Sequence, residues 1–293
     1  MRYILENEVL RAEIDSLGAE LKSVKRKSDG REYLWHGDAR YWNRTSPVLF
    51  PFVGAPKGKE YRYDGKTYAM GQHGFARDME FSPERQEGNA MWFSLKATPE
   101  TMQKYPFDFR LLIGYELSGN EVKVLWRVEN ADTREMYFSI GAHPAFLCPP
   151  GGEGDKEGCG LFFGGLTTEL HHHGNTPDGM AVMEDKILSL NQGRVKFTPG
   201  FFDECTYMVE GKQTGEVSLF DREGRVYVTV LFDTPLFGLW SPEGKNAPFV
   251  CIEPWYGRCD AVDFDGTLQE RAYENALAPG ERFAAEYRMR FES

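Results

Sequence analysis

The chain has 293 residues, of which 41% are hydrophobic and 14% aromatic, and its formal net charge at pH 7 is -11. This composition is that of a folded globular protein, because a disordered chain lacks the apolar residues that a core requires. The acidic balance disfavours a nucleic-acid backbone or an anionic membrane as the main partner, since both attract basic surfaces. Small uncharged ligands remain open as partners.

The start of the chain and its cysteines bear on where the protein works. The segment from Met1 to Asp15 is charged and alternating, unlike a signal peptide, and no apolar run approaches the ~20 residues of a membrane span. The cysteines form no CxxC pair, which favours reduced thiols over a zinc or redox site. We therefore expect a cytoplasmic protein. The cysteines are Cys148, Cys159, Cys205, Cys251 and Cys259.

Five segments alternate apolar and polar residues with a period of two, which is typical of half-buried β-strands. They cover residues 91–97, 109–117, 122–128, 226–232 and 283–291. Turn signals at 64–65, 118–120 and 221–224 indicate the short connections of antiparallel hairpins. Many such strands predict an all-β fold of stacked antiparallel sheets.

Helix signals are few along the chain. Thr98 as an N-cap, Pro99 at the first helical position and Pro106 as a stop predict a helix of about two turns. Residues 149–158, rich in Gly and charge, predict an exposed loop. Because no linker divides the sequence, we expect one domain over residues 1–293.

Three segments place ionisable residues among Gly, Pro and aromatics, as on a pocket floor. They are GQHGFARD at 71–78, GAHPAF at 141–146 and CIEPWYG at 251–257. Taken alone, His143 could be a hydrogen-bonded structural histidine and Glu253 half of a buried ion pair. Two such histidines together with Glu253 favour a functional site. Burial raises the pKa of a carboxyl group toward that of a general base, and Trp255 offers a platform for a sugar ring.

These three segments, preceded by WNRTSPVLFPFVG at 42–54, resemble the aldose 1-epimerase family, in particular its LacX-like and hexose-phosphate mutarotase branches. The resemblance extends over nearly the whole chain. It implies a galactose-mutarotase-like supersandwich of large antiparallel sheets. It also implies an isomerase of carbohydrate metabolism that interconverts the anomers of a hexose.

The resemblance also implies roles for single residues. Glu253 would be the general base, His143 the general acid, and His73 would polarise or orient the sugar near its ring oxygen. One acid and one base suffice to open and close the ring, so neither a metal nor a cofactor is expected.

Four further positions match family residues that contact substrate hydroxyls or phosphate, namely Arg44, Gln72, Arg77 and Asp203. Asp203 could equally be structural, because its neighbours match the family only loosely. Arg44 and Arg77 could form a fork for phosphate, which makes a hexose 6-phosphate an alternative substrate. We favour a free aldose, since the protein is acidic and the arginines can bind hydroxyl groups.

Two other functions remain open on the sequence. A carbohydrate-binding or sugar-sensing protein would keep Trp255 and the arginines but would not need Glu253 or His143. A glycoside hydrolase would use two carboxylates, for example Glu253 and Asp203. The run His171 to His173 predicts an exposed loop rather than a metal site, because adjacent residues of an extended chain point to alternating sides. The sequence leaves the choice of hexose and the oligomeric state open.

Overall fold

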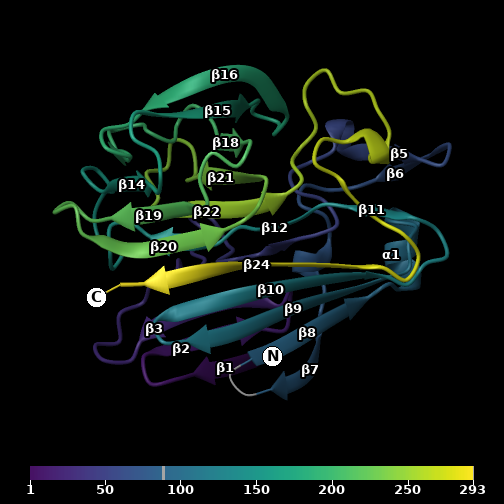
Figure 1. Ribbon diagram of the computed structural model, residues 1–293, viewed down its shortest axis with the longest axis horizontal. Coiled ribbons are helices and arrows are strands. Elements are labelled where there is room, and N and C mark those ends of the chain that lie inside the picture. Colours follow the sequence, from purple (N-terminus) through teal and green to yellow (C-terminus); the bar gives the residue numbers. More distant parts are fainter. Residues whose placement is uncertain (88–89, 293) are drawn as a thin grey trace.

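The computed structural model describes residues 1–87 and 90–292, and in them short helices connect two large and three small β-sheets (Figure 1). The largest sheet has nine strands in the order β17-β14-β19-β20-β24-β10-β9-β8-β7, and neighbouring strands are antiparallel. Its strands are β7 (Ser82–Glu87), β8 (Ala90–Lys96), β9 (Phe109–Ser118), β10 (Glu121–Asn130), β14 (Gly160–Phe163), β17 (Arg194–Lys196), β19 (Glu216–Phe220), β20 (Val226–Phe232) and β24 (Arg282–Phe291).

The second large sheet has eight strands and carries the site described below. Its order is β16-β15-β18-β21-β22-β12-β4, and β13 is a further partner of β22. Its strands are β4 (Val48–Leu49), β12 (Ile140–Ala142), β13 (Ala145–Leu147), β15 (Glu169–Asn175), β16 (Ala181–Ser189), β18 (Tyr207–Glu210), β21 (Leu236–Trp240) and β22 (Phe249–Tyr256).

Smaller elements complete the fold around these two sheets. The predicted helix is confirmed as α1, with the Thr98 hydroxyl accepting from the backbone N–H of Thr101 at 3.2 Å. Within the described residues, no helix has the length and apolarity to cross a membrane. The smaller elements are β1 (Arg2–Glu6), β2 (Leu10–Asp15), β3 (Glu20–Arg26), β5 (Glu60–Tyr63), β6 (Lys66–Ala69), β11 (Met136–Phe138), β23 (Asn275–Leu277), α1 (Pro99–Lys104), and the 3₁₀ turns η1 (Lys57–Lys59), η2 (Ala76–Asp78) and η3 (Leu268–Glu270).

The five alternating segments of the sequence are confirmed as strands β8, β9, β10, β20 and β24. In β10 the apolar residues Val122, Val124, Trp126 and Val128 are buried in the core, whereas the residues between them are half-buried or exposed. The turn at Gly119 and Asn120 joins β9 directly to β10, as predicted.

Strand β22 has two different faces, and this difference positions the site. Val250 and Ile252 point into the main core, which also contains the buried residues of β10 and β24. The alternate residues of β22 point the other way, because successive side chains of a strand lie on opposite faces. Among them are Cys251, Glu253 and Trp255, and none of the three belongs to the main core. In Figure 1, β22 lies above β24 of the larger sheet.

One prediction about local structure is wrong and another is confirmed. His171 to His173 lie in strand β15 and not in an exposed loop, because β15 pairs with β16 and β18. Their side chains do alternate, with His172 buried and its two neighbours half-buried. Residues 149–158 form turns, bends and irregular segments, and five of the ten residues are exposed, as predicted for a loop.

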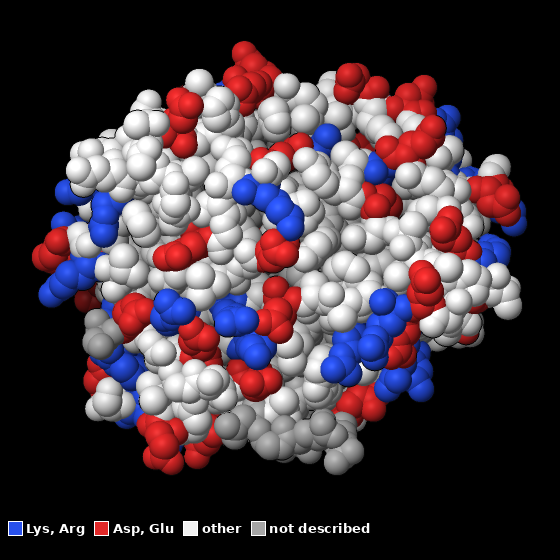
Figure 2. Space-filling view, in the orientation of Figure 1, with Lys and Arg blue, Asp and Glu red and all other residues white. Residues whose placement is uncertain are grey.

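Acidic and basic side chains are mixed on the molecular surface. On the face shown in Figure 2, most Lys and Arg side chains lie close to Asp or Glu side chains. Ion pairs between exposed side chains include Arg222 with Asp155 at 3.0 Å and Arg288 with Glu286 at 3.0 Å.

Candidate active site

Glu253 lies in the middle of β22, on the face that points away from the main core. Its side chain is 1% exposed. Strand β21 flanks it on one side, where Glu253 is opposite Gly238. Among the described residues, neither of its carboxylate oxygens has a well-aligned hydrogen-bond donor. A buried carboxyl group without donors is costly unless it stays neutral or meets a ligand, so Glu253 is suited to exchange a proton.

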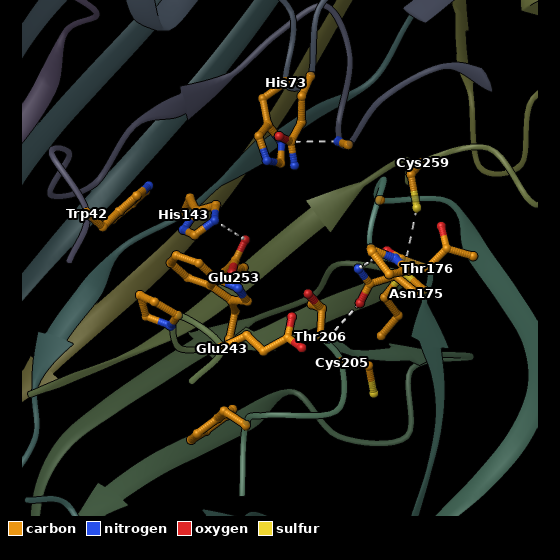
Figure 3. Close-up of a pocket in the computed structure, with 18 of the residues that line it drawn as sticks. Trp42, His73, His143, Asn175, Thr176, Cys205, Thr206, Glu243, Glu253 and Cys259 are labelled. Carbon is orange, nitrogen blue, oxygen red and sulfur yellow. Dashed lines mark hydrogen bonds and ion pairs between the residues drawn. The ribbon is translucent and has the colours of Figure 1, made fainter. Parts of the chain in front are cut away.

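His143 lies in a gap between two strands that both pair with β22. Gly141 of β12 is opposite Trp255, and Ala145 of β13 is opposite Cys251, so the same register places His143 opposite Glu253. Pro144 has no N–H to donate, which is why the ladder is interrupted at this point. Nε2 of His143 lies 3.3 Å from Oε2 of Glu253 (Figure 3).

Two tryptophans hold the imidazole of His143 in place. The Trp42 ring lies over it, with centroids 4.7 Å apart and planes at 31°. Trp240 approaches it edge-on, with centroids 5.3 Å apart and planes at 82°. Because both rings also contact each other at 5.5 Å, the orientation of His143 is fixed by packing.

His73 reaches the same place from a turn with a left-handed backbone, since φ is 67° at both His73 and Gly74. Only glycine fits the second position, because a Cβ there would lie 2.3 Å from the carbonyl oxygen of Phe50. The backbone N–H of Gly54 donates to Nδ1 of His73 at 3.1 Å. In the neutral ring the proton therefore sits on Nε2, so that His73 can donate a hydrogen bond there.

The indole of Trp255 lies across the sheet in a slot made by two glycines. A Cβ on Gly238 would lie 2.3 Å from the Trp255 ring, and a Cβ on Gly141 would lie 2.7 Å from it. The two glycines belong to β21 and β12, the neighbours of β22 on either side. Any larger residue at either position would lift the ring, so the glycines explain how Trp255 can form part of the pocket wall.

These side chains line one cavity of about 540 Å³. Glu253, His143, His73 and Trp255 contribute to it together with Gln72 and Arg77. Six of the eight predicted site residues are thus brought to one cavity. Its volume lies within the range of sites that bind small organic molecules.

Burial shifts the pKa values of the three ionisable groups in the direction that favours the neutral form of each group. It raises the pKa of Glu253 well above its usual value. It lowers the pKa of His143 to about 3, with the positive charge of Arg77 adding to the effect. It also lowers the pKa of His73 well below its usual value, and His143 contributes to that shift. The site therefore disfavours charge until a polar ligand is present.

Arg44 and Asp203 do not line this cavity. The Arg44 guanidinium is ion-paired with Asp78 at 2.7 Å. Oδ1 of Asp203 accepts a hydrogen bond from the backbone N–H of Gly244 at 2.9 Å, and Asp203 lines a separate, smaller hollow. Because Asp203 and Glu253 do not line the same cavity, the geometry does not favour a pair of hydrolytic carboxylates.

The structure adds cavity residues that the sequence did not single out as site residues. The sequence points to Trp42 only as part of a motif and gives no functional signal for Trp240, but both line the cavity. No sequence signal connects them with His143, because they come from distant segments. Further parts of the wall are formed by residues 175–179 and 204–206 and by Pro242, Glu243 and Lys245. Figure 3 shows Asn175 and Thr206 across the cavity from His143.

Within the described part of the chain, one group of side chains has potential metal ligands close together. It consists of His143, Cys251 and Glu253, whose donor atoms lie within 4.8 Å of one another. Cys251 does not line the cavity. The arrangement that faces the cavity is therefore an imidazole beside a carboxyl group, which is the arrangement of an acid and base pair.

Comparison with known proteins identifies the family of this chain. The model of the aldose 1-epimerase family matches residues 1–290. The chain belongs to the aldose 1-epimerase family. It is therefore a relative of mutarotase-like isomerases that act on sugars, as the sequence motifs predict.

Relatives of this family resemble the chain in sequence and in fold. The chromosomally encoded protein LacX of Lactococcus lactis subsp. lactis is 32% identical over 288 residues, which are 95% of each chain. The galactose mutarotase related enzyme of Lactobacillus acidophilus is 33% identical, with a TM-score of 0.92 over 100% of this chain and 98% of that one. A galactose mutarotase-like protein of Lactobacillus casei is 29% identical, with a TM-score of 0.91 over 100% of both chains. The predicted galactose-mutarotase-like fold is thus confirmed.

Proposed function

We propose that this member of the family is an aldose 1-epimerase that interconverts the α and β anomers of a free hexose. The observation that carries the proposal is the contact of His143 Nε2 with Glu253 Oε2 at 3.3 Å, at the wall of a cavity large enough for a sugar. Holding an acid and a base beside one ring replaces proton transfers through solvent by local ones.

The reaction needs one proton to leave the sugar and one to enter it. Glu253 takes the proton of the anomeric hydroxyl while His143 protonates the ring oxygen, so that the bond between C1 and the ring oxygen breaks and an aldehyde forms. Rotation about the C1–C2 bond followed by the reverse transfers closes the other anomer. His73, with its Nε2 proton, donates a hydrogen bond to the developing charge on oxygen.

The proposed roles fit the pKa shifts because Glu253 and His143 share one titratable proton, which can sit on either residue. A neutral Glu253 beside a neutral His143 has as many protons as a carboxylate beside an imidazolium. Burial favours the neutral form in the free protein. A hydroxyl group that donates to Glu253 favours the carboxylate, so the sugar itself promotes the charged form that reacts.

Charge around the cavity favours a free aldose over a hexose 6-phosphate. Arg44 is paired with Asp78, and the Arg77 guanidinium donates to the backbone carbonyl of Gln72 at 2.8 Å. Apart from the catalytic pair and Arg77, the charged side chains of the cavity wall are the acidic residues Asp178, Glu204 and Glu243 and the single cation Lys245. An anionic phosphate would be repelled by that wall more than a neutral hydroxymethyl group.

We also propose that the protein works in the cytoplasm. All five of its cysteines are free thiols, four of them buried, which agrees with a reducing compartment.

The test is mutarotation of freshly dissolved α-D-glucose, α-D-galactose and glucose 6-phosphate, followed by polarimetry with wild type and Glu253→Gln. We expect the wild type to accelerate equilibration of a free sugar, and the variant to lose about 10²-fold or more while still binding it. Glu223→Gln makes the same chemical change at an exposed turn and should leave the rate unchanged. Full activity in Glu253→Gln would refute the mechanism, and binding without any acceleration would favour a sugar sensor.

A further inference from the structure

Arg271 is buried outside the active-site cavity. Its side chain is 1% exposed, and it does not line the cavity. Its Nε donates to Oδ1 of Asp260 at 2.8 Å, and its Nη1 donates to Oε2 of Glu274 at 2.8 Å. Its Nη2 donates to the backbone carbonyl of Arg258 at 2.9 Å. Because a guanidinium is planar and its N–H groups have fixed directions, these partners hold it in one orientation.

This network holds two residues that flank Gly54. The Arg271 guanidinium lies over the ring of Phe52, with Cζ 4.3 Å from the ring centroid. Oδ2 of Asp260 accepts from the backbone N–H of Lys57 at 2.8 Å. Because Oδ1 of the same carboxylate accepts from Arg271, the guanidinium is connected to the chain on both sides of Gly54.

Gly54 is packed between this network and His73. A Cβ on Gly54 would lie 2.4 Å from Cβ of Cys259, which follows the carbonyl of Arg258 that Arg271 holds. The Gly54 carbonyl accepts from the backbone N–H of His73 at 2.7 Å, and the Gly54 N–H donates to its Nδ1 at 3.1 Å. The position of Gly54 thus determines whether Nδ1 is an acceptor, and hence whether the proton of the neutral ring is on Nε2.

We propose that Arg271 is a positioning residue of this site, which acts through Gly54 to keep His73 in the tautomer with its proton on Nε2. The effect on the rate rests on the function proposed above, whereas the tautomer is a property of the free protein. Loss of this positioning should lower kcat more than it raises KM, because His73 donates to charge that develops only in the transition state.

The test is Arg271→Lys, which keeps a cation beside Asp260 and Glu274 but loses the planar fork. Burial keeps the pKa of His73 well below its usual value, so its ring is neutral at neutral pH. NMR of the free protein with isotopically labelled histidine shows which nitrogen of that ring carries the proton, and His73→Asn identifies the signals. We expect the wild type to have the proton on Nε2 and Arg271→Lys to have a mixture of both tautomers. For mutarotation by the variant, kcat should fall about tenfold with KM changed by less than about twofold.

Met289→Ala is the control for lost stability, because it leaves a cavity in the main core and removes no contact of Arg271. It should leave the His73 signals and kcat at their wild-type values. If Arg271→Lys does not fold, Asp260→Asn takes its place, since it removes the same ion pair but keeps an oxygen for the Lys57 N–H. We expect the same mixture of tautomers there.

The tautomer and the rate are decided separately. A wild-type tautomer in the variant that folds, or an equal change in Met289→Ala, would overturn the proposal, as would an unchanged kcat in Arg271→Lys when the wild type is active. If no sugar is accelerated, the proposed function fails, and the NMR measurement alone then decides whether Arg271 positions His73.

Discussion

At the residue scale, the chemistry depends on two groups that are each pushed toward neutrality by the same cause. Burial shields Glu253 and His143 from most contact with water, so the pKa of the carboxyl rises while that of the imidazole falls to about 3. In water, Glu loses its proton before His does; here the order is reversed. Glu253 and His143 consequently share one titratable proton over a pH range that starts near pH 3. For an exposed glutamate and histidine, the corresponding range starts at a higher pH.

The pH profile of kcat/KM should reflect this reversal. A second proton is added only as the pH falls toward about 3, where His143 becomes charged, and the last proton is lost above the usual range of a glutamate. We expect activity at pH 5 to stay within about twofold of the maximum, with a bell over a wider range. Polarimetry corrected for the uncatalysed rate measures it. An acid limb centred near pH 6.5 would mean that His143 titrates as an exposed histidine does and would contradict the expectation.

At the scale of elements, the shape of the cavity depends on contacts between the loops and strands that surround it. Asp203 illustrates this, since it holds Gly244 in the loop that carries Glu243 and Lys245 to the cavity. On the other side, Lys245 donates to the backbone carbonyl of Tyr41 at 3.1 Å, next to Trp42. Asp203 therefore positions one side of the cavity without lining it.

Replacing Asp203 separates this positioning role from a contact with the sugar. Asp203→Ala removes the acceptor of the Gly244 N–H, and losing about 1 kcal/mol there should raise KM about fivefold with kcat little changed. Asp203→Asn keeps an acceptor oxygen and should restore KM to near the wild-type value. If both variants lower kcat equally, Asp203 acts on the substrate and the positioning role is wrong.

The slot for Trp255 makes a second prediction at this scale. Gly238→Ala forces a methyl group against the indole, which should cost about 1–3 kcal/mol of unfolding free energy and lower activity by moving the pocket wall. Gly71→Ala is the control, because a Cβ there meets nothing within 4 Å. Urea denaturation measures both. Equal stability of the two variants would show that the ring can move without cost.

Much of the fold and of the candidate site could be predicted from the sequence, wherever a local pattern or a family motif carries the signal. Alternation predicted β10 and β24 because each strand has one buried face, and the N-cap predicted α1. The motifs predicted that His143 and Glu253 belong to one site, because resemblance to a family carries information about residues that are distant in the sequence. The sequence could not show that Trp240 contacts His143 or that Arg44 is paired with Asp78, since these contacts join segments whose relative position depends on the whole fold.

At the scale of the whole molecule, β24 connects what would otherwise be two halves of the nine-stranded sheet. It pairs with β10 on one side and with β20 on the other. Its inward side chains, among them Tyr287 and Met289, belong to the main core, as do Val250 and Ile252 of β22. We propose on this basis that residues 1–293 form one domain.

A single domain should unfold in one cooperative step. Met289→Ala leaves a cavity in the shared core, which should cost about 2–5 kcal/mol and shift the far-ultraviolet circular dichroism and the tryptophan fluorescence transitions together. Met183→Ala, at a 45% exposed position on β16, should change stability by less than about 0.5 kcal/mol. Two separate transitions in Met289→Ala would contradict the proposal.

The three tryptophans at the cavity also provide an intrinsic fluorescence signal for ligand binding. Trp42, Trp240 and Trp255 are half of the six tryptophans of the chain, and all three line the space where the substrate is proposed to bind. A bound sugar would replace water around them, so the intrinsic emission of the unlabelled protein should report occupancy directly. Weak or unreactive ligands, which a rate measurement cannot detect, could then be ranked by simple titration.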